Sequence, residues 1–174
     1  MKQTRISTLV SNLIATAILA WGLSDLLVKL GGQLPVSTTN LLATLPVIAF
    51  VLTLLALPIF RYRAAIKQAI EQQAQGKSAD AKRASIKRVD PFYAIRVALL
   101  AKAVSIAAAV FAGWHAGVLI AVLSSPQVSS SGVWRSALGL IGSLVMAASG
   151  VIVERSCKVP PDANAGSGSD ASPA

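Results

Sequence analysis

The chain has 174 residues, of which 54% are hydrophobic and only 13% are charged, with a mean hydropathy of +0.64. This composition excludes an ordinary soluble domain and indicates one membrane domain with a short tail. A net charge of +9 would suggest nucleic acid as the partner of a soluble protein. Here the cations flank apolar stretches, where anionic lipid headgroups are the nearer partner, so we expect no nucleic-acid binding.

Four apolar stretches occur at about 6–30, 38–60, 94–123 and 136–153. Each is long enough to cross a hydrocarbon core, which needs about 20 helical residues. The first stretch follows Lys2 and Arg5, as in a signal peptide, but it is too long for a signal peptide and reads as an uncleaved anchor. The sequence predicts an all-α integral membrane protein with four transmembrane helices in residues 1–158. A disordered tail is expected at 159–174, which lacks the apolar residues needed to fold.

The positive charge is distributed unevenly among the segments that flank the apolar stretches. Of the 16 Lys and Arg residues, all but Lys29 and Arg135 lie at the N-terminus, in the loop 61–90, near the start of the third stretch or after the fourth. The two other connections, 31–37 and 124–132, carry no charge. By the positive-inside rule, this pattern predicts a multi-pass plasma-membrane protein with both termini in the cytoplasm.

The middle loop, residues 61–90, is expected to form a basic cytoplasmic helical hairpin. Its apolar residues Tyr62, Ile66 and Ile70 recur at helical spacing, which predicts a cytoplasmic extension of the second helix. Gly76 predicts a break, and a second basic segment follows at 82–88.

The third helix is expected to begin at Asp90-Pro91, because Asp is a good N-cap and Pro suits the first helical position. A helix from there to residue 123 would be about 50 Å long at 1.5 Å per residue, longer than the roughly 30 Å core. Its first turns must therefore lie outside the lipid.

Charged residues near the membrane fall into two layers. Glu154 is expected at the depth of Lys102, which predicts an inner-edge ion pair between Glu154 and Lys102 or Arg96. The outer layer comprises Asp25, Lys29 and Arg135, with Asp25 one turn before Lys29. We interpret both layers as interfacial anchors that fix helix depth. A gate or an anion site is the functional alternative.

A stripe of small residues predicts close helix packing, because small side chains let two backbones approach. In the third helix it comprises Ala101, Ser105, Ala109, Gly113, Gly117 and Ala121. In the fourth helix it comprises Gly139, Ser143 and Ala147. We expect these two helices to pack as an antiparallel hairpin, since the connection between them is short. Self-association of two chains through the same stripe is the alternative.

His115 and Cys157 are the single histidine and the single cysteine. One imidazole without further ligands does not make a metal site, so we expect His115 to bond a neighbouring helix or interfacial water. Cys157 is expected to be a free cytoplasmic thiol. Glycine-rich phosphate loops, nucleophile elbows and metal-binding motifs are absent from the sequence, so we predict no enzymatic activity and no cofactor.

A distinctive set of residues follows in order in the second half of the chain: Val89-Asp90-Pro91, Arg96, Leu100-Ala101-Lys102-Ala103, Gly113-Trp114, Gly117, Glu154-Arg155 and Cys157-Lys158-Val159-Pro160-Pro161. With these residues the chain resembles the DUF3180 family, and the resemblance covers nearly the whole topology. It implies a small actinobacterial membrane protein with four spans, in a family often encoded beside folate-biosynthesis genes. The family has no assigned activity, so the resemblance implies no catalytic residues.

The sequence as a whole favours a non-enzymatic accessory or scaffold component of the plasma membrane. Its basic hairpin would contact anionic lipid headgroups or an acidic membrane-protein partner. The alternative is a small transporter or channel subunit that forms a pore as a homo-oligomer. Transport usually needs polar residues or broken helices at the midplane, and the sequence offers only Asn12, Thr16 and the bend expected at Pro46.

Overall fold

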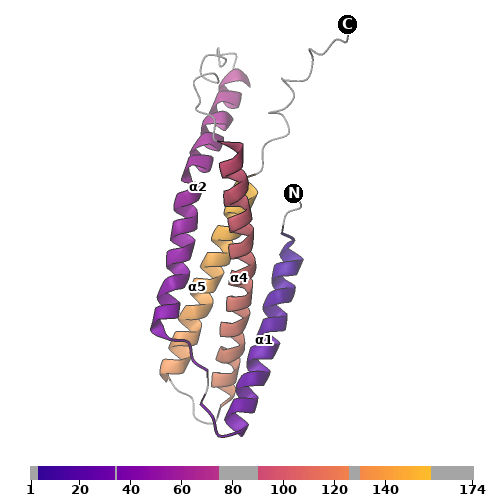
Figure 1. The fold of residues 1–174 in the computed structure, drawn as a ribbon, viewed down its shortest axis with the longest axis vertical. Coiled ribbons are helices and arrows are strands. Elements are labelled where there is room, and N and C mark those ends of the chain that lie inside the picture. The colour runs from indigo at the N-terminus through magenta and orange to yellow at the C-terminus, as the bar shows by residue number, and fades with distance from the viewer. Residues whose placement is uncertain (1–3, 34, 75–89, 126–129, 158–174) are drawn as a thin grey trace.

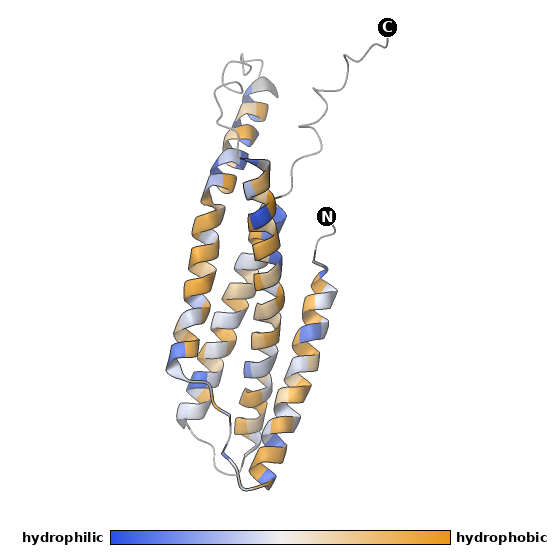
Figure 2. Cartoon of the chain, in the orientation of Figure 1, coloured by the Kyte–Doolittle hydropathy of each residue, from blue (hydrophilic) through white to orange (hydrophobic). Residues whose placement is uncertain are grey.

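The structure, a computed structural model, describes residues 4–33, 35–74, 90–125 and 130–157, and the regular elements in these ranges are all α-helices. Helix α1 spans Ile6–Lys29, α2 Thr39–Ala74, α4 Pro91–Ser124 and α5 Ser130–Ser156. All four are long and apolar enough to cross a membrane, and Figure 2 shows apolar residues along most of their lengths. The predicted all-α class with four candidate spans is therefore confirmed.

Two of the helices are longer than the apolar stretches predict. Helix α5 begins at Ser130 rather than near residue 136, and α2 continues past residue 60 to Ala74. The longer α2 agrees with the expected extension of the second helix. Gly76 and the second basic segment, 82–88, lie outside the described residues, as does the tail 159–174.

Two of the helix ends have well-defined caps. Asp90 accepts a hydrogen bond from the backbone N–H of Phe92 at 2.9 Å, and Pro91 occupies the first turn of α4, as expected. Helix α1 ends at Lys29, and Gly31 follows with a φ of +77°, which favours glycine. The N–H of Gly31 bonds the carbonyl of Val28 at 3.0 Å, and the N–H of Gly32 bonds that of Leu27 at 2.8 Å. This is a Schellman motif, which satisfies the last carbonyls of the helix.

The helices form an antiparallel up-and-down arrangement along the chain, with α4 between α1 and α5 (Figure 1). Helix α4 packs extensively against both of these neighbours, whereas α2 packs mainly against α5 and touches α4 only slightly. The predicted packing of the third helix against the fourth is therefore confirmed. The structure adds α1 as a second partner of α4.

A seam of apolar residues joins α2 to the central pair. Along α2 the buried positions alternate between steps of four and three residues, as in the seam of a coiled coil. They are Leu45, Ala49, Leu52, Ala56 and Ile59. The same core includes Val97, Ala101, Val104 and Ala108 from α4 and Met146 and Val153 from α5.

Candidate functional site

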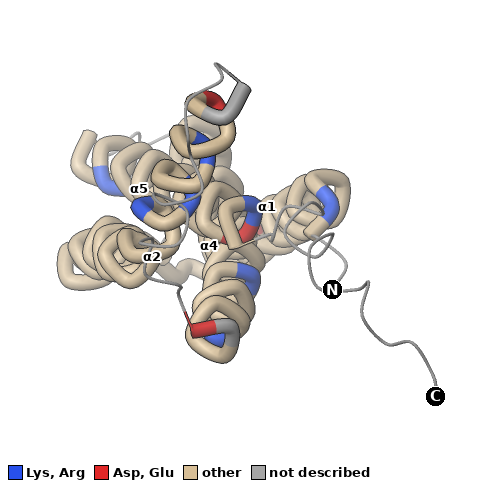
Figure 3. Tube along the Cα trace, turned by 90° about the horizontal axis from the view of Figure 1, so that it is seen from above, with Lys and Arg blue, Asp and Glu red and all other residues tan. Residues whose placement is uncertain are grey.

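Most cations of the described residues gather at one end of the bundle. We call this the cationic end: it holds the start of α1, the end of α2, the start of α4 and the end of α5 (Figure 1). Figure 3 looks onto the bundle from this side, with Lys and Arg in blue. The cations here are Arg5, Arg61, Arg63, Lys67, Arg96, Lys102 and Arg155. At the opposite end are Lys29 and Arg135.

Arg63 forms a hydrogen bond between the extension of α2, residues 61–74, and the end of α5. Its Nη1 donates a hydrogen bond of 3.1 Å to the backbone carbonyl of Arg155. The last carbonyls of a helix lack partners within that helix and carry partial negative charge, so a guanidinium is favourable there. The extension also carries an exposed ion pair between Lys67 and Glu71, with an N–O distance of 3.8 Å.

Glu154 binds the backbone of the N-terminal segment. Its Oε1 accepts a hydrogen bond of 2.8 Å from the backbone N–H of Thr4, just before α1. Within the described parts of the chain, no ion pair joins Glu154 to Arg96. The carboxylate has a backbone partner that the sequence did not predict, and its pairing with Lys102 stays a prediction. The backbone contact follows from the position of α1, which packs on α4 and brings its start to the carboxylate.

The expected outer pair is present at the opposite end. Lys29 Nζ lies 2.7 Å from Asp25 Oδ2, one turn apart on α1. The pair is solvent-accessible, so it contributes little stability in water. Arg135 is exposed near the start of α5. Among the described residues it has no ion pair with Asp25, so the predicted three-residue cluster reduces to the Asp25–Lys29 pair.

The first part of the α4 stripe faces α5, as predicted. A Cβ added at Gly150 of α5 would lie 3.0 Å from the carbonyl oxygen of Ala101 and 3.0 Å from the Cβ of Ser105. The helices approach closely there because neither side has a bulky side chain. In α5, Ser143 is also buried, and its hydroxyl bonds the carbonyl of Gly139 at 2.7 Å.

The two glycines of the same stripe face α1 instead. A Cβ at Gly113 would lie 2.8 Å from the Cβ of Thr16, and one at Gly117 would lie 2.7 Å from the Cβ of Ala20. The expectation that this part of the stripe packs against the fourth helix is therefore wrong. Four residues turn a helix by about 400°, so a four-residue repeat drifts by about 40° per step. Between Ser105 and Gly117 the stripe rotates by about 120°, from one neighbour to the other.

Two contacts between helices were not predicted, although the sequence contains a signal for each of them. Ala17, Ala20 and Ser24 of α1 recur at steps of three and four, which is the signature of a packing face. The second is a hydrogen bond of 2.7 Å from the Tyr93 hydroxyl of α4 to the Leu55 carbonyl of α2. Pro58 lies three residues after Leu55, so this part of α2 has a weakened hydrogen-bond ladder.

His115 lies in the interface between α4 and α5. The side chain is almost fully buried, with 1% of the residue exposed, and its ring lies against Gly139. Its Nε2 has no hydrogen-bond partner in the described part of the protein. The expected bond to a neighbouring helix is not formed by this atom. Within the described ranges, no cluster of three or more His, Cys, Asp or Glu residues could hold a metal ion.

Cys157 follows the last residue of α5 and is half-buried. Burial raises the pKa of its thiol, and the nearby charge of Glu154 raises it further, whereas Arg63 lowers it. The largest of these effects is burial. The thiolate is the reactive form of cysteine, so this thiol is less reactive at neutral pH than an exposed one.

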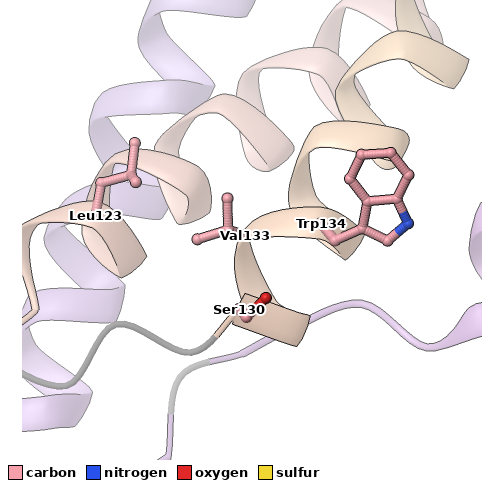
Figure 4. A pocket seen from close by; sticks show the side chains of 4 residues that line it. All are labelled: Leu123, Ser130, Val133 and Trp134. Carbon is pink, nitrogen blue, oxygen red and sulfur yellow. The ribbon is translucent and has the colours of Figure 1, made fainter.

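A hollow of about 480 Å³ lies at the opposite end of the bundle (Figure 4). Leu123 from the end of α4 lines it together with Ser130, Val133 and Trp134 from the start of α5. It is open, and the described residues of its lining include no charged side chain. This surface therefore offers little for the recognition of a polar ligand.

Comparison with known proteins gives a family match. The model of a family described as "Protein of unknown function (DUF3180)" matches residues 9–161. The match covers α1, α2, α4 and α5 almost completely. No curated protein and no solved structure matches the chain.

Proposed function

The chain belongs to the DUF3180 family of proteins of unknown function, and we propose that it is a non-enzymatic accessory or scaffold component of the plasma membrane. Four helices would cross the bilayer, with both termini in the cytoplasm. The cationic end would bind anionic lipid headgroups and an acidic segment of a membrane-protein partner.

The observation that carries this proposal is the sorting of charge between the two ends of the bundle. Seven described cations lie at the cationic end, against two at the opposite end. Of those two, Lys29 is paired with Asp25. Positive charge is enriched in the cytoplasmic parts of membrane proteins, which supports the proposed orientation.

The exposure of the cations supports lipid as a partner. Arg5, Arg61, Arg96 and Arg155 are exposed on different helices around the cationic end. Each Lys or Arg close to an anionic membrane surface contributes about 1 kcal/mol, so several together bind such a surface strongly. The attraction is screened by salt and weakens over a Debye length of about 8 Å at physiological ionic strength.

The hydrogen bonding of three hydroxyl groups within the spans favours a scaffold over a pore. The hydroxyls of Thr16, Ser24 and Thr53 each bond a backbone carbonyl four residues earlier in their own helix, at 2.7, 2.7 and 2.8 Å respectively. Hydroxyls satisfied in this way need no water, whereas a conducting pathway is lined by groups that bind the solute.

The lipid component of the proposal can be tested with matched charge variants. The protein is reconstituted with phosphatidylglycerol and phosphatidylcholine, and the lipids that stay bound after extraction are quantified by mass spectrometry. We expect enrichment of phosphatidylglycerol that falls in the Arg61→Gln/Arg96→Gln variant and is unchanged in Lys29→Gln/Arg135→Gln. Equal effects of the two double variants would contradict the proposal.

The partner component is tested by purifying the full-length protein from its native membrane in a mild detergent. A stoichiometric complex with a second membrane protein supports the accessory role. A symmetric homo-oligomer with a water-filled axis would overturn it in favour of a small transporter or channel subunit.

A further inference from the structure

Two buried polar atoms, one on α4 and one on α5, have no partner among the described residues. They are Nε2 of His115 and Oγ of Ser136, and each residue is 1% exposed. A buried polar group without a partner costs about 1–3 kcal/mol. For this reason, such groups are nearly always bonded either to protein or to an ordered water molecule.

The imidazole of His115 covers a glycine of α5 that lies one helical turn from Ser136. A Cβ added at Gly139 would lie 2.5 Å from Nδ1 and 2.7 Å from Cγ of His115, so the imidazole covers Gly139. Ser136 lies three residues before Gly139 on α5, and side chains at this spacing are neighbours with Cβ atoms about 5–6 Å apart. The hydroxyl thus belongs to a residue one helical turn from the glycine that the imidazole covers, and one water molecule with two hydrogen bonds of about 2.7–3.0 Å spans roughly 5–6 Å between polar atoms.

Ser136 differs from the other buried serines of the protein. The hydroxyls of Ser24 and Ser143 bond carbonyls of their own helices at 2.7 Å, and that of Ser105 does so at 2.9 Å. Such local bonds are the usual way for a serine in a membrane helix to satisfy its hydroxyl. Because Ser136 makes no such bond in the described structure, its hydroxyl is available for another partner.

We propose that His115 and Ser136 form a binding site for one internal water molecule between α4 and α5. The water bonds Nε2 of His115 and Oγ of Ser136 at the same time. A hydroxyl and a water molecule can each donate or accept, so the site fits either neutral tautomer of the imidazole. Water suits a site with two polar partners inside an otherwise apolar interface. The site is independent of the proposed lipid binding at the cationic end.

The single histidine makes a direct test possible. Labelling with ¹⁵N-histidine gives one imidazole signal pair, and solid-state NMR of the full-length protein in lipid vesicles measures the transfer of magnetisation from water protons to Nε2. We expect clear transfer in the wild-type protein and the loss of most of it in Ser136→Ala. Ser143→Ala is the matched control, because that serine is buried in the same interface but bonded to Gly139.

Two outcomes would overturn the proposal. The first is the absence of water transfer to Nε2 in the wild-type protein, which needs no variant and so does not depend on a variant folding. If the Nε2 resonance then shifts in Ser136→Ala, the two side chains are bonded directly. The second is an equal loss of water transfer in Ser136→Ala and Ser143→Ala.

Discussion

The imidazole of His115 occupies the space that a side chain at Gly139 would need. A Cβ at Gly139 would meet Nδ1 at 2.5 Å and Cγ at 2.7 Å, which is closer than real Cβ contacts. The two residues come from antiparallel neighbours, α4 and α5. The only histidine of the chain and a glycine of the predicted packing stripe are therefore a complementary pair.

We expect Gly139→Ala to destabilise the protein because the added methyl group displaces the buried ring. Overpacking of this kind typically costs about 1–3 kcal/mol. Gly22→Ala is the matched control, since a Cβ there meets nothing within 4 Å and gains only helix propensity. Thermal unfolding in mild detergent should show a lower midpoint for Gly139→Ala alone. Equal midpoints for the two variants would mean that the ring does not constrain position 139.

Gly113→Leu should loosen the contact between α4 and α1. The new side chain would clash with the backbone nitrogen of Ala17, which lies only 3.1 Å from the position of a Cβ at Gly113. A backbone atom cannot relieve this clash by a change of rotamer. We expect a loss of about 1–3 kcal/mol in the free energy of unfolding. Limited proteolysis at the N-terminus and thermal unfolding both report this loss. Gly22→Leu on the open face of α1 should leave both unchanged, and an equal effect there would refute the assignment of Gly113 to the α1 contact.

Tyr93→Phe should weaken the contact between α4 and α2. The substitution removes the 2.7 Å hydrogen bond to the carbonyl of Leu55 and keeps the ring. The expected cost is about 1 kcal/mol, the usual net value of one such bond. The control is Tyr62→Phe, which removes the hydroxyl of the half-buried tyrosine of α2. Thermal unfolding should show a lower midpoint for Tyr93→Phe than for this control. No difference between these variants would mean that water replaces the phenol at Leu55.

The alkylation of Cys157 should depend on pH and on two neighbouring charges. Its pKa is raised by burial, so the thiolate is scarce at neutral pH and the rate should increase as the pH rises. Arg63→Gln removes a charge that lowers this pKa and should slow the reaction, whereas Glu154→Gln should accelerate it. The rate is measured with a maleimide on the purified protein. Changes of the same sign in both variants would show that accessibility, rather than charge, controls the reaction.

The sequence was sufficient to predict the spans, because a long apolar stretch bounded by charges has few other interpretations. It also identified the Asp90 cap and the Asp25–Lys29 pair, which depend on residues close together in the chain. The partner of Glu154 could not be predicted in this way. The carboxylate bonds Thr4, 150 positions earlier, and that contact exists only because α1 docks on α4.

The stripe of small residues on α4 faces two different helices, which the sequence alone also did not predict. A repeat of four residues reads as one face in the sequence, yet it rotates around a helix with 3.6 residues per turn. Gly113 and Gly150 are both packing glycines, but their neighbours are Thr16 of α1 and Ser105 of α4, respectively. Small residues predict that another helix approaches closely at that position. The partner is determined by the arrangement of all four helices.

The most direct test of the proposed topology uses single cysteines in a Cys157→Ser background. Gln33→Cys places an exposed thiol in the connection between α1 and α2, and Gln68→Cys places one on the extension of α2 at the cationic end. Cells are treated with a membrane-impermeant maleimide before or after permeabilisation. The account predicts that Gln33→Cys is labelled in intact cells and Gln68→Cys only after permeabilisation. Labelling of Gln68→Cys in intact cells, with Gln33→Cys protected, would contradict it.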